Sequence, residues 1–342
     1  MSNIVQALRL RGLVTSTDTE HHGRRGRGVR LSGKNGYVVG IDFGHRHLSV
    51  ALANVAQEVL GEQTRRLKAG HRHEDGLRLA AELVQTLLED AGARREDVVG
   101  AGMTLPAPMD SRSHEVGAPS VLPGWVGVNA PEVASERLGF QVHVDNDANL
   151  AAMAEHMWGA GRGVDNLVYL LLGEGIGAGL ILEGRLFRGG SGAAGEIGHI
   201  TIDELGKVCR CGNRGCLETI VSTTQVLALL EPTHGTDLTL LDVVSAARRG
   251  DVGARRVLAD TGRTIGVAVA NLCNILNPEL ILVGGELAQA DDLLLDPMRE
   301  IVSRYGVPGA VRELHIRPAQ LGTRSALLGA VAIGLHHAEI TG

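Results

Sequence analysis

The stretch 209–218, CRCGNRGCLE, holds three of the four cysteines of the chain, ten residues after the motif GEIGH that ends at His199. Three sulfur donors and one imidazole are the number and kind of ligand that a tetrahedral structural zinc prefers. Gly212 and Gly215 lie between the cysteines and allow a tight turn that aims the side chains at one ion. Gaps of one and four residues differ from the two-residue gap of a redox pair, and a turn with free thiols is the remaining alternative. The predicted zinc ligands are His199, Cys209, Cys211 and Cys216.

Composition limits the class of protein around this motif. The chain has 342 residues, with 44% hydrophobic and 21% charged residues, which predicts two globular domains. The longest apolar runs are strand-sized, and the N-terminus lacks the apolar core of a secretory signal, so we expect a cytoplasmic protein without membrane spans. Four cysteines are too few for a disulfide scaffold, and Cys273 is expected in a core. A net charge of −6 argues against nucleic-acid binding over the whole surface.

The pattern of apolar residues predicts two α/β lobes. Strands from Tyr37 onward follow one another as an antiparallel meander, and helices and further strands alternate after them. The predicted divisions are a basic N-terminal segment (1–36), a first lobe (37–150), a second lobe with the cysteine motif (151–324) and a terminal helix (325–342) that packs back on the first lobe.

The first 36 residues are locally basic. A short helix over 3–11 is expected to end at Gly12, and the glycine-rich stretch after it resembles the tip of a basic hairpin. Arg24, Arg25 and Arg27 on this tip would contact phosphates weakly, whereas a solvated basic linker is the alternative.

Polar residues beside the cysteine motif and after one strand form a candidate ligand site. Glu196 and Glu218 flank the motif, so an ion there would draw two carboxylates and an imidazole together, an array suited to sugar hydroxyls. Asn146 and Asp147 end a strand and open a helix, where α/β folds bind ligands. Asp147 could act as a general base toward a hydroxyl. The alternatives are solvated surface glutamates and a helix N-cap.

Three glycine turns follow strands and present backbone N–H groups of the kind that bind phosphate oxygens. They are GIDFGHRH, LLGEGIGAG and LVGGE, and each is equally compatible with a plain turn. The candidate phosphate-binding residues are Asp42, Gly44, Gly173, Glu174, Gly175, Gly177, Gly284 and Gly285.

Together, GEIGH, CRCGNRGCLE, the preceding DND and LGEGIGAG resemble the ROK family of sugar kinases, open reading frames and repressors, over residues 37–342. The resemblance implies a two-lobed, actin-like (ribonuclease H-like) fold that binds a sugar between its lobes. It implies a catalytic-base position at Asp147, and it gives His199 one ring nitrogen for zinc and the other for the sugar. The implied sugar contacts are Asn146, Asp147, Glu196, His199 and Glu218.

The chain departs from the family at the nucleotide turns. Kinases of the family carry Asp-x-Gly-Gly-Thr where this chain has residues 42–46, DFGHR, and Gly-Thr-Gly where it has Gly-Glu-Gly at 173–175. A carboxylate at Glu174 would repel a γ-phosphate, so we expect a sugar sensor whose kinase activity is lost. The alternatives are an active hexose kinase that uses Mg²⁺-ATP with Asp147 as base, and a sugar-binding protein with neither activity.

The basic segment completes the resemblance. Family repressors carry a winged helix-turn-helix domain before the sugar domain, and residues 2–32 resemble the end of its recognition helix and its wing. No supporting helix precedes Met1, so we expect a partial winged helix. The implied partners are a monosaccharide, operator DNA if the winged helix is complete, and a second copy of the chain in a homodimer or larger homo-oligomer. The identity of the sugar and of the operator stays open.

Overall fold

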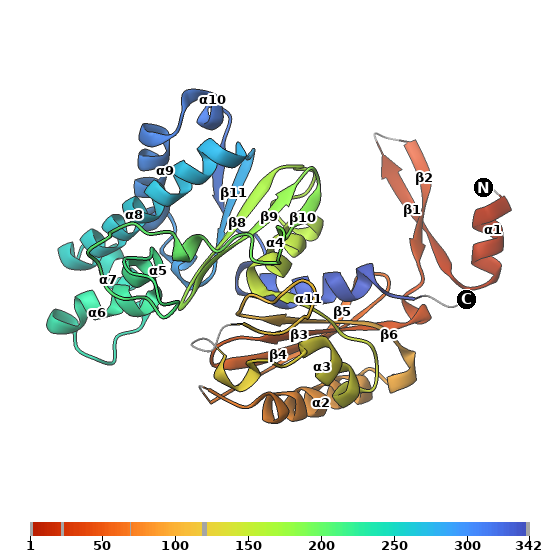
Figure 1. Cartoon of the computed structure of the whole chain (residues 1–342). Helices are drawn as coiled ribbons and strands as arrows, with labels where there is room; N and C mark the ends of the chain where they lie inside the picture. The colour runs from red at the N-terminus through yellow and green to blue at the C-terminus, as the bar shows by residue number, and fades with distance from the viewer. Residues whose placement is uncertain (1–2, 22–23, 69, 118–121, 340–342) are drawn as a thin grey trace.

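The structure is a computed structural model that describes residues 3–21, 24–68, 70–117 and 122–339, without the side chains of residues 3 and 17–27. The body of the chain forms two lobes, each built on a five-stranded sheet with helices packed against it (Figure 1). The predicted two-lobed α/β fold is therefore confirmed.

The first sheet has the strand order β5-β4-β3-β6-β7. Its strands are β3 (Tyr37–Phe43), β4 (His47–Asn54), β5 (Val59–Arg66), β6 (Val98–Leu105) and β7 (His143–Asn146). The predicted antiparallel meander is confirmed in β3, β4 and β5, while β6 and β7 run parallel to β3. β3 is buried almost throughout because both faces of the sheet are covered, which explains its continuous apolar run.

Helices cover both faces of this sheet. α2 (His73–Asp90) packs on one face with α3 (Ala130–Leu138) beside it, and α11 (Ser325–His336) packs on the other (Figure 1). A Cβ on Gly102 of β6 would lie 2.1 Å from the carbonyl oxygen of Ala330 in α11. Glycine at this position therefore allows the C-terminal helix to lie directly on the first sheet.

The second sheet has the order β10-β9-β8-β11-β12. Its strands are β8 (Leu167–Leu172), β9 (Ile176–Leu182), β10 (Arg185–Phe187), β11 (Leu280–Gly284) and β12 (His315–Pro318). The helices of this lobe are α5 (Glu218–Val221), α6 (Thr223–His234), α7 (Leu240–Arg248), α8 (Val252–Leu276), α9 (Asp292–Tyr305) and α10 (Pro308–Val311). The largest core of the lobe lies between sheet and helices and includes Cys273, as predicted.

One helix connects the two lobes. α4 (Asp147–Trp158) begins where β7 ends and contacts both α11 and β9 (Figure 1). Its fully buried Glu155 accepts hydrogen bonds from the backbone N–H of Leu321 at 2.7 Å and of Ala160 at 2.9 Å. The boundary expected at residue 150 falls inside this helix. α4 thus carries Asp147 at its start into the space between the two sheets.

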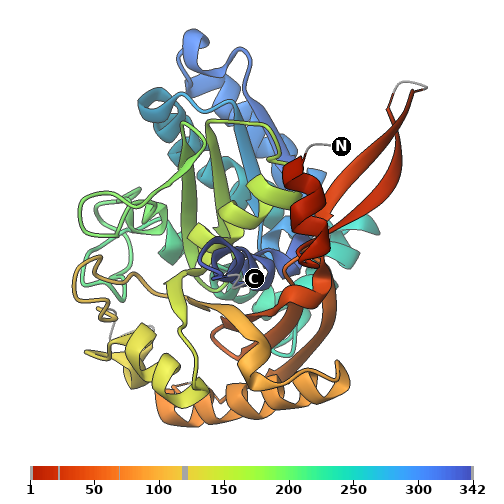
Figure 2. The ribbon, with the colours of Figure 1, turned by 90° about the vertical axis from the view of Figure 1, so that its right-hand side faces the viewer.

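The N-terminal segment is a helix followed by a hairpin. The elements are α1 (Asn3–Leu10), β1 (Val14–His21) and β2 (Arg24–Leu31). The predicted end of the helix is confirmed, because Gly12 has a left-handed φ of +72°. The hairpin projects from the body of the molecule in Figure 2.

The predicted basic hairpin is present, and Arg24 stands in its last register pair, opposite His21. Arg25 and Arg27 lie farther along β2, which corrects the expectation that all three arginines lie between the strands. Arg25 is in register with Glu20 and Arg27 with Asp18. The side chains of Arg24, Arg25 and Arg27 lie outside the described part of the structure.

Candidate functional site

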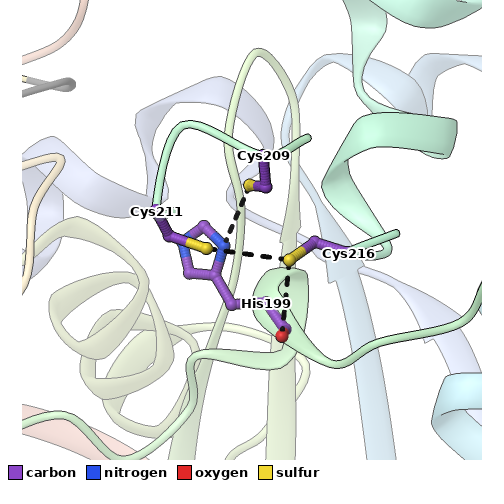
Figure 3. A group of neighbouring side chains, drawn as sticks. All are labelled: His199, Cys209, Cys211 and Cys216. Atoms are coloured by element: carbon purple, nitrogen blue, oxygen red, sulfur yellow. Dashed lines mark hydrogen bonds between the residues drawn. The ribbon is translucent and has the colours of Figure 1, made fainter. Parts of the chain in front are cut away.

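Four side chains of the second lobe converge on one point. His199 lies at the end of the 3₁₀ turn Ile197–His199, and the three cysteines come from the loop before α5 (Figure 3). Their ligand atoms all lie within 4.8 Å of one another. The predicted cluster is therefore formed. Its members are His199, Cys209, Cys211 and Cys216.

The spacing of these atoms fits a tetrahedral zinc. Cys211 Sγ lies 3.7 Å from Cys216 Sγ, and Cys209 Sγ lies 3.6 Å from His199 Nδ1. Zinc bonds are about 2.3 Å long to sulfur and about 2.0 Å long to nitrogen. At the tetrahedral angle, two sulfur ligands are then about 3.8 Å apart, and a sulfur and a nitrogen ligand about 3.5 Å apart. Four protein donors complete a structural coordination shell and leave no position for a reacting water.

The cysteine loop is held in shape by its own backbone. Cys209 N donates to Asn213 O at 2.7 Å, which closes the turn between the first and last cysteine. Gly215 has a φ of +66°, and a Cβ there would lie 1.5 Å from the carbonyl oxygen of Asp203. Only glycine fits this position, so the loop can bring its sulfur atoms together before α5 begins.

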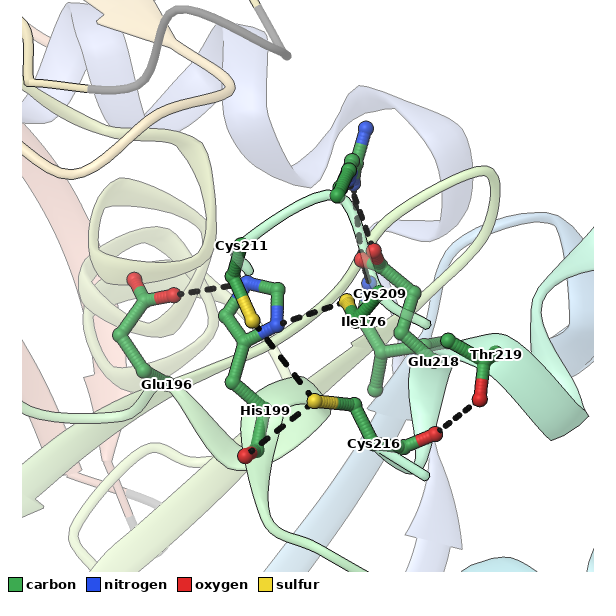
Figure 4. A network of polar contacts seen from close by, with 9 residues as sticks. Ile176, Glu196, His199, Cys209, Cys211, Cys216, Glu218 and Thr219 are labelled. Atoms are coloured by element: carbon green, nitrogen blue, oxygen red, sulfur yellow. Dashed lines mark hydrogen bonds and ion pairs between the residues drawn. The ribbon is translucent and has the colours of Figure 1, made fainter. Parts of the chain in front are cut away.

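His199 connects this cluster to the cavity between the lobes. Its Nδ1 faces Cys209, and its Nε2 lies 3.7 Å from Glu196 Oε2 (Figure 4). The two ring nitrogens therefore point to different partners. Burial is the main cause that raises the pKa of the Glu196 carboxyl above its usual range.

Glu218 lies on the other side of the cluster, at the start of α5 (Figure 4). Its Oε1 and Oε2 accept hydrogen bonds from Arg210 Nε and Nη2, both at 2.8 Å. Its Oε2 also accepts from the backbone N–H of Ile176 at 3.1 Å. A carboxylate held by a bidentate guanidinium and an amide is fixed in orientation, yet each of its oxygens has two lone pairs, so Oε1 can accept a further hydrogen bond.

Asn146 and Asp147 meet the same cavity from the first lobe. Asn146 caps α4, because its side-chain oxygen accepts from Ala148 N at 3.0 Å. The N-cap interpretation is thus correct for Asn146. Asp147 is therefore not needed as the cap. Burial and, next, the charge of Asp42 raise the pKa of its carboxyl group to about 7. A carboxyl group of this pKa changes between proton donor and acceptor near neutral pH.

The turn between β3 and β4 is closed by its own side chains. Asp42 is buried and accepts hydrogen bonds from the Thr104 hydroxyl and from His47 Nε2, the latter at 3.1 Å. The hydrogen bond to Asp42 raises the pKa of His47. The imidazole of His47 lies over Gly44, where a Cβ would meet the ring at 2.0 Å. Each oxygen of the Asp42 carboxylate therefore accepts one hydrogen bond from the chain itself.

The turn between β8 and β9 lies opposite in the second lobe. Gly173 N donates to Gly175 O at 3.0 Å, and Glu174 projects from the turn. Arg46 Nε of the first lobe lies 3.3 Å from Glu174 Oε1. The carboxylate of Glu174 is therefore paired with a cation of the other lobe, which the sequence did not indicate.

One cavity of about 520 Å³ between the lobes unites these groups. The predicted residues that line it are Asp42, Gly44, Asn146, Asp147, Gly173, Glu174, Gly175, Gly177, Glu196, His199, Glu218 and Gly285. Gly284 lies outside the lining, since a Cβ on it would meet the hydroxyl of Tyr169 at 1.9 Å. Its role is to allow close packing inside the lobe.

Five basic lining residues were not predicted: His45, Arg46, His47, Arg210 and Arg324. Arg210 had a usable signal, because a residue between two metal-binding cysteines is held beside the cluster. In the sequence, His45 and Arg46 were noted only because they stand where kinases of the family have Gly-Thr in the first turn. Arg324 pairs with Glu62 across a long sequence separation, so its position had no local signal.

Similar proteins of known name fall in one family. The sequence model of the ROK family matches residues 38–337. A xylose repressor of Caldicellulosiruptor bescii is 30% identical over 325 residues, which are 91% of this chain and 81% of that protein. A glucokinase of Halalkalibacterium halodurans is 33% identical over 317 residues, which are 86% of this chain and 93% of that protein.

Among solved structures, a ROK family transcriptional regulator described as a homologue of the E. coli MLC protein has a TM-score of 0.81. It is 27% identical and covers 98% of this chain and 87% of that chain. The fold is thus the two-lobed, actin-like one, and the cluster of one histidine and three cysteines is typical of the zinc site of the ROK family. Repressors and kinases resemble the chain at similar levels of identity.

Proposed function

We propose, from the premise that the chain belongs to the ROK family, that it is a sugar-responsive transcriptional regulator without kinase activity. A hexose or related sugar would bind in the cavity between the lobes. The observation that carries the proposal is the pairing of the two nucleotide turns with each other, Arg46 with Glu174.

These turns offer little to a nucleotide. Phosphoryl transfer depends on positioning the phosphates and neutralising their charge. Here Asp42, the acidic residue of the first turn, accepts from Thr104 and His47. Glu174 adds a carboxylate on the opposite side of the cavity. A triphosphate would have to displace Arg46 from Glu174 and would then meet that carboxylate.

The other end of the cavity is well suited to a sugar. Glu196, His199 and Glu218 are positioned by the cluster, and Asp147 faces them from α4. Each sugar hydroxyl offers one proton and two lone pairs, which matches an array of carboxylates beside an imidazole. We assign the sugar contacts to Asn146, Asp147, Glu196, His199 and Glu218, and the zinc ligands to His199, Cys209, Cys211 and Cys216. Zinc would supply rigidity at this end of the cavity and take no part in a reaction.

The N-terminal segment supports a regulator. The repressor and the regulator structure cover 91% and 98% of this chain, whereas the glucokinase covers 86%. Residues 1–36, with α1 and the hairpin, precede the part matched by the family model. We propose that this segment belongs to a DNA-contacting module, that lobes 37–150 and 151–324 respond to the sugar, and that the chain acts as a homodimer or larger homo-oligomer.

A hexose kinase is the second candidate, and one observation favours it. Asp147 lies in the cavity with a pKa of about 7, which suits a general base toward a sugar hydroxyl. The glycines of the second turn also line the cavity. A kinase with this site would bind Mg²⁺-ATP between the lobes.

A coupled assay with Mg²⁺-ATP and glucose, N-acetylglucosamine, mannose or xylose tests the two candidates, together with calorimetric titration of each sugar. We expect binding of one sugar without turnover. A rate of about 1 s⁻¹ or more, as kinases show, would overturn the regulator. The triple variant His45→Gly, Arg46→Thr and Glu174→Thr should gain ATP affinity. If it gains none, the explanation from the turns is wrong.

A further inference from the structure

We propose that His45 and Arg46 of the first lobe, with Glu174, Arg210 and Glu218 of the second, form a bridge that replaces the nucleotide phosphates and holds the lobes together around the sugar site. We call these five residues the interlobe bridge. The inference deepens the proposed function, because it rests on Glu218 being a sugar contact.

The first contact of the interlobe bridge joins the tips of two turns. Arg46 follows β3 and Glu174 follows β8, and their side chains meet with a nitrogen–oxygen distance of 3.3 Å. The Arg46 side chain is 75% exposed and that of Glu174 is 36% exposed. Exposed ion pairs of this kind are weak singly, so this contact is only one part of the bridge.

The second contact is deeper. A Cβ built on Gly175 would lie 3.3 Å from Arg210 Nη2, 3.6 Å from Glu218 Oε2 and 3.7 Å from His45 Nε2. Three polar side chains from both lobes therefore lie around one glycine of the second turn. Burial and the nearby Arg210 lower the pKa of His45, although Glu174 and Glu218 oppose this shift. A neutral imidazole has one donor and one acceptor for this polar surrounding.

Arg210 extends the interlobe bridge to the sugar end. It lies between two cysteines of the cluster and binds both oxygens of Glu218. Glu218 Oε2 also accepts from Ile176 N, the residue that follows the second turn. The orientation of Glu218 and the position of the second turn are thereby linked. Arg210 is a positioning residue in this arrangement, since it acts through Glu218.

As a consequence of the interlobe bridge, closure of the two lobes does not require a bound nucleotide. In a kinase, lobe closure around two substrates needs a ligand that contacts both turns. In this chain a cation of one turn contacts an anion of the other, and the contact is part of the polypeptide. The lobes are therefore held in a sugar-competent arrangement by residues that a triphosphate would have to displace.

Hydrogen exchange of the sugar-free full-length chain, read by mass spectrometry, tests the interlobe bridge directly. The variants are Arg46→Glu, Glu174→Arg and the double charge exchange. We expect Arg46→Glu to speed exchange of the amides of 173–177, in the opposite lobe, by about two- to fivefold. The double variant should restore slow exchange.

The matched control is Arg256→Glu, which breaks an ion pair with Asp260 on α8 whose arginine is also 75% exposed. It should leave exchange of 173–177 unchanged. The proposal is overturned if Arg46→Glu leaves these amides unchanged, or if the double variant exchanges as fast as the single ones.

Sugar titration separates this inference from the proposed function. Arg46→Glu should weaken sugar binding about two- to fivefold, and Arg210→Gln about tenfold, because it frees Glu218. If wild-type protein binds none of the four sugars, the regulator proposal fails, whereas the exchange data still decide whether the interlobe bridge exists. Unchanged sugar affinity in Arg210→Gln would overturn the positioning role of Arg210.

Discussion

The two ends of the interlobe cavity use similar side chains in opposite ways. At the proposed sugar end, Glu196 lies beside His199 and Glu218 is bound by Arg210 and Ile176 N, all of the same lobe. At the nucleotide end, Asp42 and Glu174 are carboxylates already engaged by His47 and Arg46. The partners of Glu218 come from its own lobe, whereas the partner of Glu174 comes from the other lobe.

The difference follows from what surrounds each end. The proposed sugar end rests on the metal-ligand cluster, whose three cysteines belong to one short loop and lie beside the fourth donor, His199. The nucleotide end consists of two turns from different lobes, and each turn carries a charged residue at its tip. One end is therefore rigid by construction, and the other depends on contacts between the lobes.

Removal of the cysteine cluster should have the largest effect on this comparison. Cys216→Ser takes one sulfur from a buried site, so we expect the bound metal to be lost, stability to fall by about 4 kcal/mol and sugar binding to disappear. Metal content by mass spectrometry and thermal unfolding measure this. Cys273→Ala is the control, since Cys273 is buried in α8 away from the cluster. Retention of metal by Cys216→Ser would contradict the prediction.

Neutralising one carboxylate at each end should have the next largest effect. Glu218→Gln loses the charge-assisted bonds to Arg210, and we expect sugar affinity to fall about 10- to 100-fold. At the nucleotide end, Glu286→Gln changes an exposed glutamate that lines the cavity and whose charge acts on His47, and it should alter affinity less than about twofold. Calorimetric titration measures both variants. Equal losses would show that the two ends do not differ in the way proposed.

The sequence was sufficient for the rigid end. The spacing of the cysteines predicts the cluster, because all ligands but His199 lie in one loop. The position of Asn146 and Asp147 at the end of a strand predicts their place in the cavity. The meander of the first lobe follows from strand patterns separated by short turns. These features depend on residues that are close in the chain.

The side-chain contacts of the nucleotide end could not be predicted from the sequence. A carboxylate at Glu174 was expected, but its partner Arg46 lies in the other lobe, and no local pattern indicates that pairing. Gly284 and Gly285 are adjacent and chemically identical, yet only Gly285 lines the cavity. Which of them does so depends on the packing of Tyr169 inside the second lobe. Contacts between distant segments decide such cases.

A change of pH sharpens the comparison at Asp147. Its folded pKa of about 7 lies above the ordinary aspartate value, so the stability that the protonated carboxyl contributes is present at low pH and lost as pH rises from about 4 to about 7. Asp147→Asn removes this titration. Relative to wild type, the sugar-free variant should gain about 1.5 kcal/mol between pH 4 and pH 8, because water in the cavity screens part of the charge. Denaturant unfolding at several pH values measures the gain, and a pH-independent difference would contradict it.

His47 at the nucleotide end should show a pH dependence in the same direction and the smallest effect. The hydrogen bond to Asp42 raises its folded pKa, so its contribution to stability is complete below the unfolded value of 6.5 and is lost as pH rises through the folded pKa. The side chain is 48% exposed, and we therefore expect His47→Ala to cost about 0.5 kcal/mol at pH 5.5 and almost nothing at pH 9. His315→Ala, on an exposed position of β12, is the control. An equal cost of His47→Ala at both pH values would mean that the imidazole only fills space over Gly44, and that Asp42 is still available to a nucleotide-bound cation.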